Sequence, residues 1–244
     1  MWFAEPEALV GEQALLDSYR QLLCPEEAAQ QQRFMFERHR LQYLVSHALV
    51  RTTLSRYGAL DPQDWTFRKN DHGRPDVDNA GYQQLIFNLS HTDGLVVCAV
   101  TTRHALGVDV EDRQRNTRTA EIADRFFSPS EVSALRRLPQ REQRERFFLL
   151  WTLKEAYIKA RGLGLALPLD KFSFDVDGGD SITIAVEPPI VDDVDAWQFF
   201  SFCPNGRHRC SLAVKLVAAS RPLRLVARQI VPLRDETCRA FDPF

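Results

Sequence analysis

The sequence has little cysteine and no long hydrophobic run, and both shortages exclude classes of protein. Five cysteines stand among 244 residues, and they form neither a CxxC pair nor a cluster with histidine. This scatter argues against a disulfide framework and against a zinc site, and it suits the reduced thiols of a cytoplasmic protein. The strongest apolar runs, LVVCAV and FFLLW, are far shorter than the roughly 20 residues of a membrane-spanning helix. We therefore expect a cytoplasmic protein without a membrane segment.

An excess of charge of one sign is also missing. Lysine and arginine number 31 against 33 for aspartate and glutamate, which gives a formal net charge of −2. No global basic field favours nucleic acid, so any electrostatic preference for a partner is local. The first twenty residues carry acids and no basic segment ahead of an apolar core, and we expect no export signal. With 44% hydrophobic and 26% charged residues, the composition is that of a globular protein.

Apolar spacing and turn residues predict the elements of the first half. Helix formers with apolar residues at helical spacing predict a helix over about 25–57, ending before Gly58. A turn is expected at 71–73, and QQLIFNLSHTDGLVVCAV predicts two short strands around a polar loop. HALGVDVE predicts a further strand.

The second half has the same order of helices before strands. Two short helices are expected within 119–138, the second capped by Ser128 or Ser130, and a long helix over about 140–160. Four short β-rich runs follow Gly162, and they predict one antiparallel sheet with the preceding helices packed on it. We expect an α+β protein of two similar halves, 1–104 and 105–220, followed by a basic tail, 221–244.

Two acids of GVDVE share one face of their strand. Side chains alternate along a strand, so Asp109 and Glu111 point together, away from the face of the neighbouring valines. Like charges on one face cost free energy unless the face is solvated or a cation lies between them. A bound cation is the sharper interpretation.

A third acid is offered by WTLKEAYIKARG, where Glu155 and Lys159 stand four residues apart on a helix. The simplest interpretation is a surface ion pair worth about 0.3–0.5 kcal/mol. Alternatively, Glu155 completes a site of three carboxylates and Lys159 points at an anion held there. Carboxylate oxygens without histidine or cysteine select Mg²⁺, or Mn²⁺ in its place, over zinc. Lys154 and Arg161 fit ordinary solvated charges.

Two further stretches carry possible anion-binding groups. In NLSHTDG, Ser90, His91 and Thr92 are expected in a loop, where a histidine is by default just exposed. Hydroxyl groups and an imidazole are also suitable donors to phosphate oxygens. The second stretch is GRP at 73–75, where a solvated turn is the simplest interpretation.

In this order, these pieces resemble the motifs of the Sfp-type 4′-phosphopantetheinyl transferases. The matching stretches are GRP at 73–75, FNLSHTDG at 87–94, GVDVE at 107–111 and FFLLWTLKEAYIKARG at 147–162. The resemblance implies a pseudo-twofold arrangement of two α+β halves, with coenzyme A bound between them. It further implies transfer of the 4′-phosphopantetheine arm of coenzyme A to a serine of an apo acyl or peptidyl carrier protein, with release of adenosine 3′,5′-bisphosphate.

The resemblance also implies roles for single residues. Asp109, Glu111 and Glu155 would hold Mg²⁺, and Lys159 would bind coenzyme A and stabilise charge on the leaving phosphate. Either Glu155 or a water held by Glu111 would take the proton of the carrier serine. By position in the family, the expected contacts of the coenzyme A phosphates are Arg38, Arg74, Ser90 and His91, with His91 near the 3′-phosphate and Arg40 and Arg68 as further candidates.

The partner implied by the resemblance is an acidic carrier protein. Residues 113–146 hold nine arginines against five acids, and a basic rim would attract such a carrier, although the same charges fit a solvated helix face. Whether the acceptor belongs to fatty-acid, polyketide or nonribosomal peptide synthesis is open, and a monomer is sufficient. Two other functions stay open: a Mg²⁺-dependent hydrolase of coenzyme A or a related nucleotide, and a non-catalytic adaptor that binds coenzyme A or the carrier.

Overall fold

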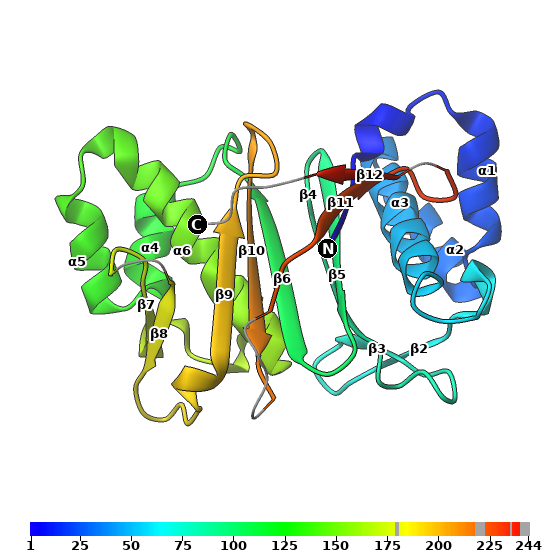
Figure 1. The fold of residues 1–244 in the computed structure, drawn as a ribbon. Coiled ribbons are helices and arrows are strands. Elements are labelled where there is room, and N and C mark those ends of the chain that lie inside the picture. Colours follow the sequence, from blue (N-terminus) through cyan, green and yellow to red (C-terminus); the bar gives the residue numbers. More distant parts are fainter. Residues whose placement is uncertain (179–180, 218–222, 235, 240–244) are drawn as a thin grey trace. The chain divides into compact units, whose positions relative to one another are not determined.

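The computed structural model describes residues 1–178, 181–217, 223–234 and 236–239. Within them, the chain divides into two compact units (Figure 1). Unit 1 holds residues 1–103 and returns for 225–239, whereas unit 2 holds the described residues of 104–224. Each unit combines helices with antiparallel strands, so the predicted α+β class is confirmed.

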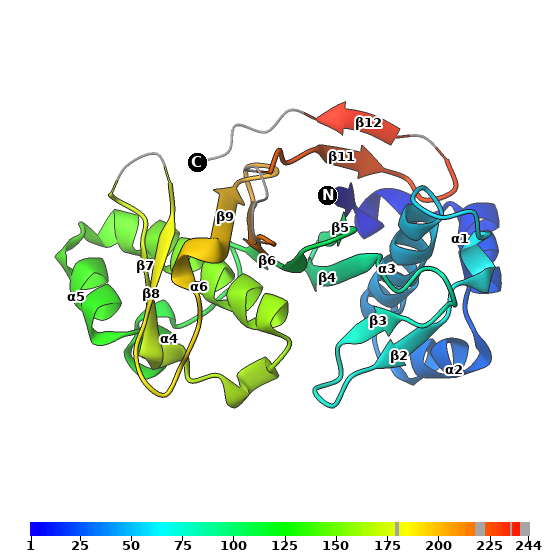
Figure 2. The ribbon, with the colours of Figure 1, turned by 60° about the horizontal axis from the view of Figure 1, so that its bottom comes forward.

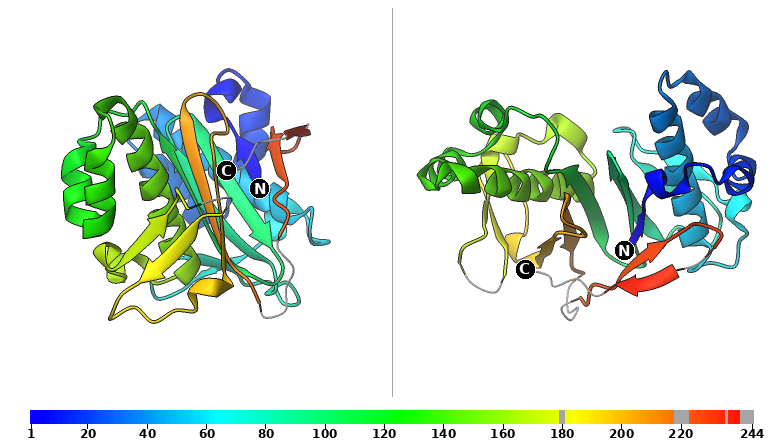
Figure 3. Two further views of the ribbon diagram at one scale, coloured as in Figure 1. Left: turned by 60° about the vertical axis from the view of Figure 1, so that its left-hand side comes forward. Right: turned by 90° about the horizontal axis from the view of Figure 1, so that it is seen from above.

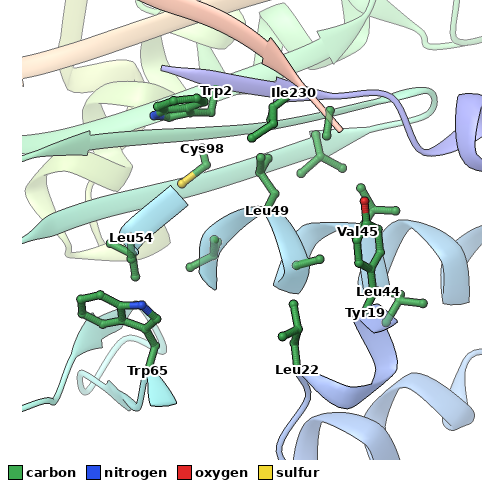
Figure 4. Close-up of a cluster of buried hydrophobic side chains, with 14 of the residues drawn as sticks. Trp2, Tyr19, Leu22, Leu44, Val45, Leu49, Leu54, Trp65, Cys98 and Ile230 are labelled. Carbon is green, nitrogen blue, oxygen red and sulfur yellow. The ribbon is translucent and has the colours of Figure 1, made fainter. Parts of the chain in front are cut away.

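Unit 1 packs helices against a five-stranded sheet with the strand order β12-β11-β1-β5-β4. Its elements are β1 Trp2–Ala4, α1 Gln13–Gln21, α2 Pro25–Arg33, α3 Glu37–Leu54, β2 Phe67–Lys69, β3 Pro75–Val77, β4 Ile86–Thr92, β5 Leu95–Thr101, β11 Ala227–Ile230 and β12 Glu236–Arg239, with short 3₁₀ helices at Pro6–Leu9 and Pro62–Asp64. The core lies between α3 and the sheet, where Leu49 of α3 and Cys98 of β5 are buried together with Trp2 of β1 (Figure 4).

The helix predicted over 25–57 is in fact two helices, α2 and α3, and α1 precedes them. Phe34 and Phe36 have extended backbones, with ψ of 130° and 135°, and they separate the two helices. The guanidinium of Arg40 donates to the carbonyl oxygen of Phe34 at 2.8 Å. This contact satisfies a carbonyl that a continuous helix would have paired internally.

The polar residues predicted to form a loop lie in β4 instead. Ser90, His91 and Thr92 pair with Val97, Val96 and Leu95 of β5. The turn between β4 and β5 consists of only Asp93 and Gly94, and Gly94 has a φ of +83°, which suits glycine. The hydrogen bonds between paired strands are formed by backbone groups and do not depend on the side chains. The polar side chains of Ser90, His91 and Thr92 therefore do not end the strand. The turn predicted at 71–73 is confirmed between β2 and β3, where the amide of Gly73 donates to the carbonyl of Asn70.

Unit 2 contains two sheets rather than the one that was predicted. Its elements are β6 Ala105–Asp112, α4 Thr119–Phe126, α5 Pro129–Arg137, α6 Gln140–Arg161, β7 Phe172–Asp175, β8 Thr183–Val186, β9 Trp197–Phe202 and β10 His208–Lys215, with 3₁₀ helices at Gly164–Ala166, Leu169–Lys171 and Val194–Ala196. Strands β6, β10 and β9 form one sheet, whereas β7 and β8 form a separate hairpin. Ser128 caps α5 as predicted.

The long helix α6 runs along the β6-β10-β9 sheet (Figure 3). Its buried residues, among them Phe147, Phe148, Leu153 and Tyr157, form the core of unit 2. No helix among the described residues is long and apolar enough to cross a bilayer. The helix and the sheet together are the frame on which the candidate site is built.

The segment set apart as a basic tail contributes β11 and β12 to unit 1. Strand β11 pairs in parallel with β1, with Trp2 opposite Arg228 and Phe3 opposite Gln229 (Figure 2). The guanidinium groups of Arg56 and Arg228 lie 4.8 and 5.1 Å from the centre of the Trp2 ring. The last strands therefore belong to the sheet in which the chain begins.

Candidate active site

Strand β6 presents Asp109 and Glu111 on the face covered by α6. In the ladder with β10, Asp109 lies opposite Ser211 and Glu111 lies opposite Arg209. Both acids are buried, at 5% and 9% exposure of the residue. Asp109 and Glu111 therefore share one face of β6, as the alternation of side chains predicted, and this face is buried.

Gly107 explains how α6 comes so close to the acids. A Cβ atom at this position would lie 2.1 Å from the carbonyl oxygen of Ala156 and 2.4 Å from the amide nitrogen of Ala160. Only a residue without a side chain permits that approach. The glycine that opens GVDVE thus allows the backbone of α6, with Glu155 and Lys159, to lie directly against β6.

Lys159 is bound to β6 rather than standing on the helix surface. Its Nζ donates to Oδ1 of Asp109 at 2.6 Å and to the carbonyl oxygen of Val108 at 3.1 Å. The side chain is 27% exposed. The ammonium group is therefore in a partly buried contact with one of the three acids and is still reached by solvent.

The charge of Asp109 acts on both glutamates of the site. Burial and then the charge of Asp109 raise the pKa of Glu111 to about 7. The same two causes, in the same order, raise the pKa of Glu155, while Lys159 lowers it. Negative charge is thus concentrated at a place where water does not screen it well.

Glu111 has two partners that the sequence reasoning did not assign. The indole N–H of Trp151 donates to Oε1 at 3.1 Å, and the guanidinium of Arg115 lies 2.8 Å from Oε2. Trp151 precedes Glu155 by one helical turn, and this spacing was the available signal that both residues share a face of α6. Arg115 follows β6 in a loop, and no pattern in the sequence pointed to it.

Lys154 and Arg161 are not solvated charges. The side chain of Lys154 is fully buried and its Nζ lies 2.8 Å from Oε2 of Glu131, with donations to the carbonyl oxygens of Leu169 and Phe172. Arg161 lies 2.8 Å from Oδ2 of Asp192. In both cases, the charged group is paired with an acid that is distant in the sequence.

Oxygen ligands suited to Mg²⁺ are present, but they do not form a closed set. Asp109, Glu111 and Glu155 offer only carboxylate oxygens, and their mutual repulsion is what a divalent cation would relieve. Among the residues that the structure describes, no three side chains of His, Cys, Asp or Glu converge closely enough to hold a metal ion. The donor chemistry fits magnesium, and the ammonium of Lys159 partly neutralises Asp109 in this arrangement.

Apart from Lys159 on α6, the predicted coenzyme A contacts lie in unit 1. Ser90 and His91 are neighbours on β4, and because side chains alternate they point to opposite faces, Ser90 buried and His91 exposed. Arg74 lies just before β3 with its side chain 16% exposed and its Nε 3.5 Å from Oδ1 of Asp76. Arg68 is exposed and pairs with Asp78.

Arg38 lies in the first turn of α3. Its guanidinium is exposed, donates to the ring of His39 at 3.3 Å and lies 5.6 Å from the centre of the Phe36 ring. One helical turn further on, Gln42 donates to the carbonyl oxygen of Thr92 at 3.0 Å. The face of α3 that carries Arg38 and Gln42 is therefore the face that meets the end of β4.

Comparison with known proteins covers nearly the whole chain. The model of the 4′-phosphopantetheinyl transferase superfamily matches residues 105–213, and the model of the 4′-phosphopantetheinyl transferase N-terminal region matches residues 12–103. The 4′-phosphopantetheinyl transferase HetI of Nostoc sp. is 32% identical over 196 residues, which cover 79% of this chain and 78% of that protein.

Two further similarities were found. The 4′-phosphopantetheinyl transferase Sfp of Bacillus subtilis is 34% identical over 157 residues, 64% of this chain and 68% of its own. The solved holo-[acyl-carrier-protein] synthase of Thermotoga maritima overlaps 46% of this chain and 62% of its own, with 22% identity and a TM-score of 0.38, a level that carries no argument about this chain. The two family models and the relatives agree with the motifs on β3, β4, β6 and α6, and the chain belongs to the Sfp-type 4′-phosphopantetheinyl transferase family.

Proposed function

We propose that the chain transfers the 4′-phosphopantetheine arm of coenzyme A to a serine of an apo carrier protein and releases adenosine 3′,5′-bisphosphate. Membership of the family supports the reaction, and the relatives compared are named as transferases. The observation that carries the proposal is the arrangement of Lys159 on α6 against Asp109 on β6, with Glu111 and Glu155 electrostatically coupled to it. Neither a hydrolase nor a non-catalytic adaptor is favoured by any of these observations.

Mg²⁺ dependence is part of the proposal, and Mn²⁺ would replace Mg²⁺. Asp109, Glu111 and Glu155 are the residues that would hold the ion. When bound, it would neutralise oxygens of the pyrophosphate. The proposal is supported by the purely carboxylate donor set and by the burial and the charge of Asp109, which together raise the pKa of both glutamates.

A base is needed for the hydroxyl proton of the carrier serine. In the absence of a bound cation, a carboxylate with a raised pKa holds a proton more readily near neutral pH than an ordinary one does, and bound Mg²⁺ would lower that pKa again. Burial and Asp109 raise the pKa of Glu111 to about 7 and also raise that of Glu155. Both candidates, Glu155 itself and a water held by Glu111, therefore stay in the proposal.

Lys159 is proposed to stabilise charge on the leaving phosphate. Its ammonium is fixed by Asp109 and the carbonyl of Val108. A donor fixed before reaction adds no reorganisation cost when charge develops. With 27% of its side chain exposed, the group can still be reached by a bound phosphate.

For the phosphates of coenzyme A we propose Arg38, Arg74, Ser90 and His91. His91 is exposed on β4, which suits contact with the 3′-phosphate. Arg38 shares a helix face with Gln42, and Gln42 donates to the carbonyl of Thr92 at the end of β4. Arg38 therefore lies on the same side of unit 1 as β4, the strand that carries His91.

An acidic carrier protein is the proposed partner. Several of the nine arginines are already used within unit 2: Arg113 pairs with Glu145, Arg144 donates to two loop carbonyls, and Arg146 pairs with Asp177. Arg136 likewise pairs with Asp124 at 2.5 Å. The proposed rim is therefore narrower than the sequence suggested and centres on exposed residues such as Arg125 and Arg137. A monomer in the cytoplasm stays a prediction.

Incubation with an apo carrier protein, coenzyme A and Mg²⁺ tests the proposal. Mass spectrometry should show a carrier heavier by one phosphopantetheine group, with one adenosine 3′,5′-bisphosphate released for each carrier modified. Free phosphopantetheine without carrier modification would indicate a hydrolase instead. Fewer than one turnover per protein molecule would indicate an adaptor. A panel of fatty-acid, polyketide and peptide-synthetase carriers compared by kcat/KM would identify the acceptor class.

A further inference from the structure

Asp192 holds together three elements of unit 2, although it lies outside every motif stretch. It precedes β9, and its side chain is only 2% exposed. Its Oδ2 accepts hydrogen bonds from the hydroxyl of Tyr157 at 2.7 Å, from Arg161 at 2.8 Å and from the indole of Trp197 at 2.9 Å. Its Oδ1 accepts from Lys215 of β10 at 2.5 Å. One buried carboxylate thus joins α6, β9 and β10.

Two of these donors belong to the last two turns of α6. Tyr157 and Arg161 are four residues apart, and Arg161 also donates to the hydroxyl of Tyr157 at 2.8 Å. Lys159 is offset by two residues from each of them, and Glu155 is offset by two residues from Tyr157. An offset of two residues is about 200° around the helix. Asp192 therefore holds the side of α6 opposite to the side from which Lys159 reaches Asp109.

The contacts of Asp192 are charge-assisted. Burial alone would raise the pKa of Asp192, but Lys215, Tyr157 and Arg161 hold it below its usual range. The carboxylate is therefore charged at neutral pH and faces two cations. Hydrogen bonds to charged groups are shorter and about twice as strong as neutral ones. Removal of this acceptor leaves buried donors unpaired.

We propose that Asp192 is a positioning residue for the transfer reaction: it fixes the rotation of the last turns of α6 so that Lys159 stays against Asp109. The inference rests on the proposed function of Lys159. Asp192 itself touches none of the acids of the candidate site among its described contacts, and it acts through Tyr157 and Arg161. A displacement of about 1 Å at a reacting group can cost about 10² in rate.

Asp192→Asn tests the proposal with little change in shape, because the amide keeps one acceptor oxygen but loses the charge. We expect kcat per folded molecule to fall by about tenfold or more while KM for coenzyme A changes by less than about twofold. Asp177→Asn is the matched control, since it weakens a two-bond pair with Arg146 on the first half of the same helix. An unchanged kcat in folded Asp192→Asn would overturn the proposal.

Hydrogen exchange gives a readout that does not depend on activity. Asp192→Asn should raise amide exchange within residues 155–162 but not within 140–148, whereas Asp177→Asn should leave 155–162 unchanged. If the wild-type chain modifies no carrier, the proposed function is wrong. Hydrogen exchange would still test whether Asp192 stabilises the last turns of α6. Should Asp192→Asn not fold, Tyr157→Phe removes a single donor and should give a smaller change of the same kind. Unaltered exchange at 155–162 in whichever variant folds would contradict the inference.

Discussion

Nζ of Lys159 lies 2.6 Å from Oδ1 of Asp109, which makes this pair a direct link between α6 and β6 in the candidate site. Lys159→Ala should lower kcat by about 10²–10³, as is typical of a lost preorganised donor, and should raise KM for coenzyme A much less. Steady-state kinetics with thermal melts as a folding check measure both effects. Lys171→Ala is the control, because Lys171 pairs with Glu187 at 3.7 Å on the surface of the same unit. An unchanged kcat in folded Lys159→Ala would leave the lysine without a catalytic role.

Loss of a proposed metal ligand should abolish transfer without unfolding the chain. Asp109→Ala and Glu155→Ala each remove a carboxylate from the proposed Mg²⁺ site, and a chelator should likewise stop the wild-type reaction until Mg²⁺ is restored. Titration calorimetry with Mn²⁺ measures binding directly, and circular dichroism reports the fold. Glu187→Ala removes an exposed acid and should change neither property. Activity near that of wild type at saturating Mg²⁺ would exclude the ligand assignment.

The imidazole of His91 should distinguish coenzyme A from its dephosphorylated form. If His91 contacts the 3′-phosphate, His91→Ala should raise KM for coenzyme A by about tenfold or more, as for a lost hydrogen bond to a charged group, and leave dephospho-coenzyme A nearly unaffected. His72→Ala changes another exposed histidine of unit 1 and should affect neither substrate. Equal losses for both substrates would remove His91 from this role.

Gly107 should tolerate no side chain. The added Cβ of Gly107→Ala would lie 2.1 Å from the carbonyl oxygen of Ala156, and because that neighbour is helix backbone, the strand and helix would have to separate. We expect a loss of about 3 kcal/mol or more in the free energy of unfolding, measured by urea denaturation. Gly206→Ala is the control, since nothing lies within 4 Å of its added Cβ. Similar midpoints for both variants would contradict the close packing of α6.

Acid should destabilise unit 1 through Glu27. Burial acts to raise the pKa of Glu27, but the hydrogen bond and charge of His47, the amide of Cys24 and the charge of Arg51 lower it from 4.5 to about 2. The unfolded chain therefore binds this proton first, so the stabilisation is complete above about pH 4.5 and is lost as the pH falls toward 2.

This depressed pKa corresponds to about 3 kcal/mol, for a side chain that is 15% exposed. Glu27→Gln should be less stable than wild type at pH 6, and the difference should vanish toward pH 2. Unfolding followed by fluorescence from pH 2 to pH 6 measures it. A difference that stays constant over this range would show that Glu27 does not contribute through its charge.

The sequence predicted what depends on local pattern. The capped helix after Ser128, the long helix ending at Gly162, and the shared face of Asp109 and Glu111 all follow from side-chain period and capping chemistry. These same features carry the acids and Lys159, so the composition of the proposed site was predictable. The roles of its residues remain predictions.

What the sequence did not predict depends on contacts between distant residues. No proline or glycine marks the break at Phe34–Phe36, and the contact of Arg40 with the carbonyl of Phe34, six residues earlier, does not follow a regular helical spacing. From the sequence alone, Lys154 is interpreted as a surface charge, because its partner Glu131 lies 23 residues earlier. Asp192 lies in an irregular segment without periodicity, so its four side-chain donors become visible only in the folded structure.

The parallel pairing of β1 with β11 has a consequence for biosynthesis. Strand β1 stands in the middle of its sheet, with β5 on one side and β11 on the other. While the ribosome is still making unit 2, β5 is present but Ala227–Ile230 do not yet exist, so one edge of β1 has no neighbour from its own chain. An unpaired strand edge can recruit a strand from another molecule. Unit 1 of a nascent chain should therefore be most prone to aggregation until its final strands emerge from the exit tunnel.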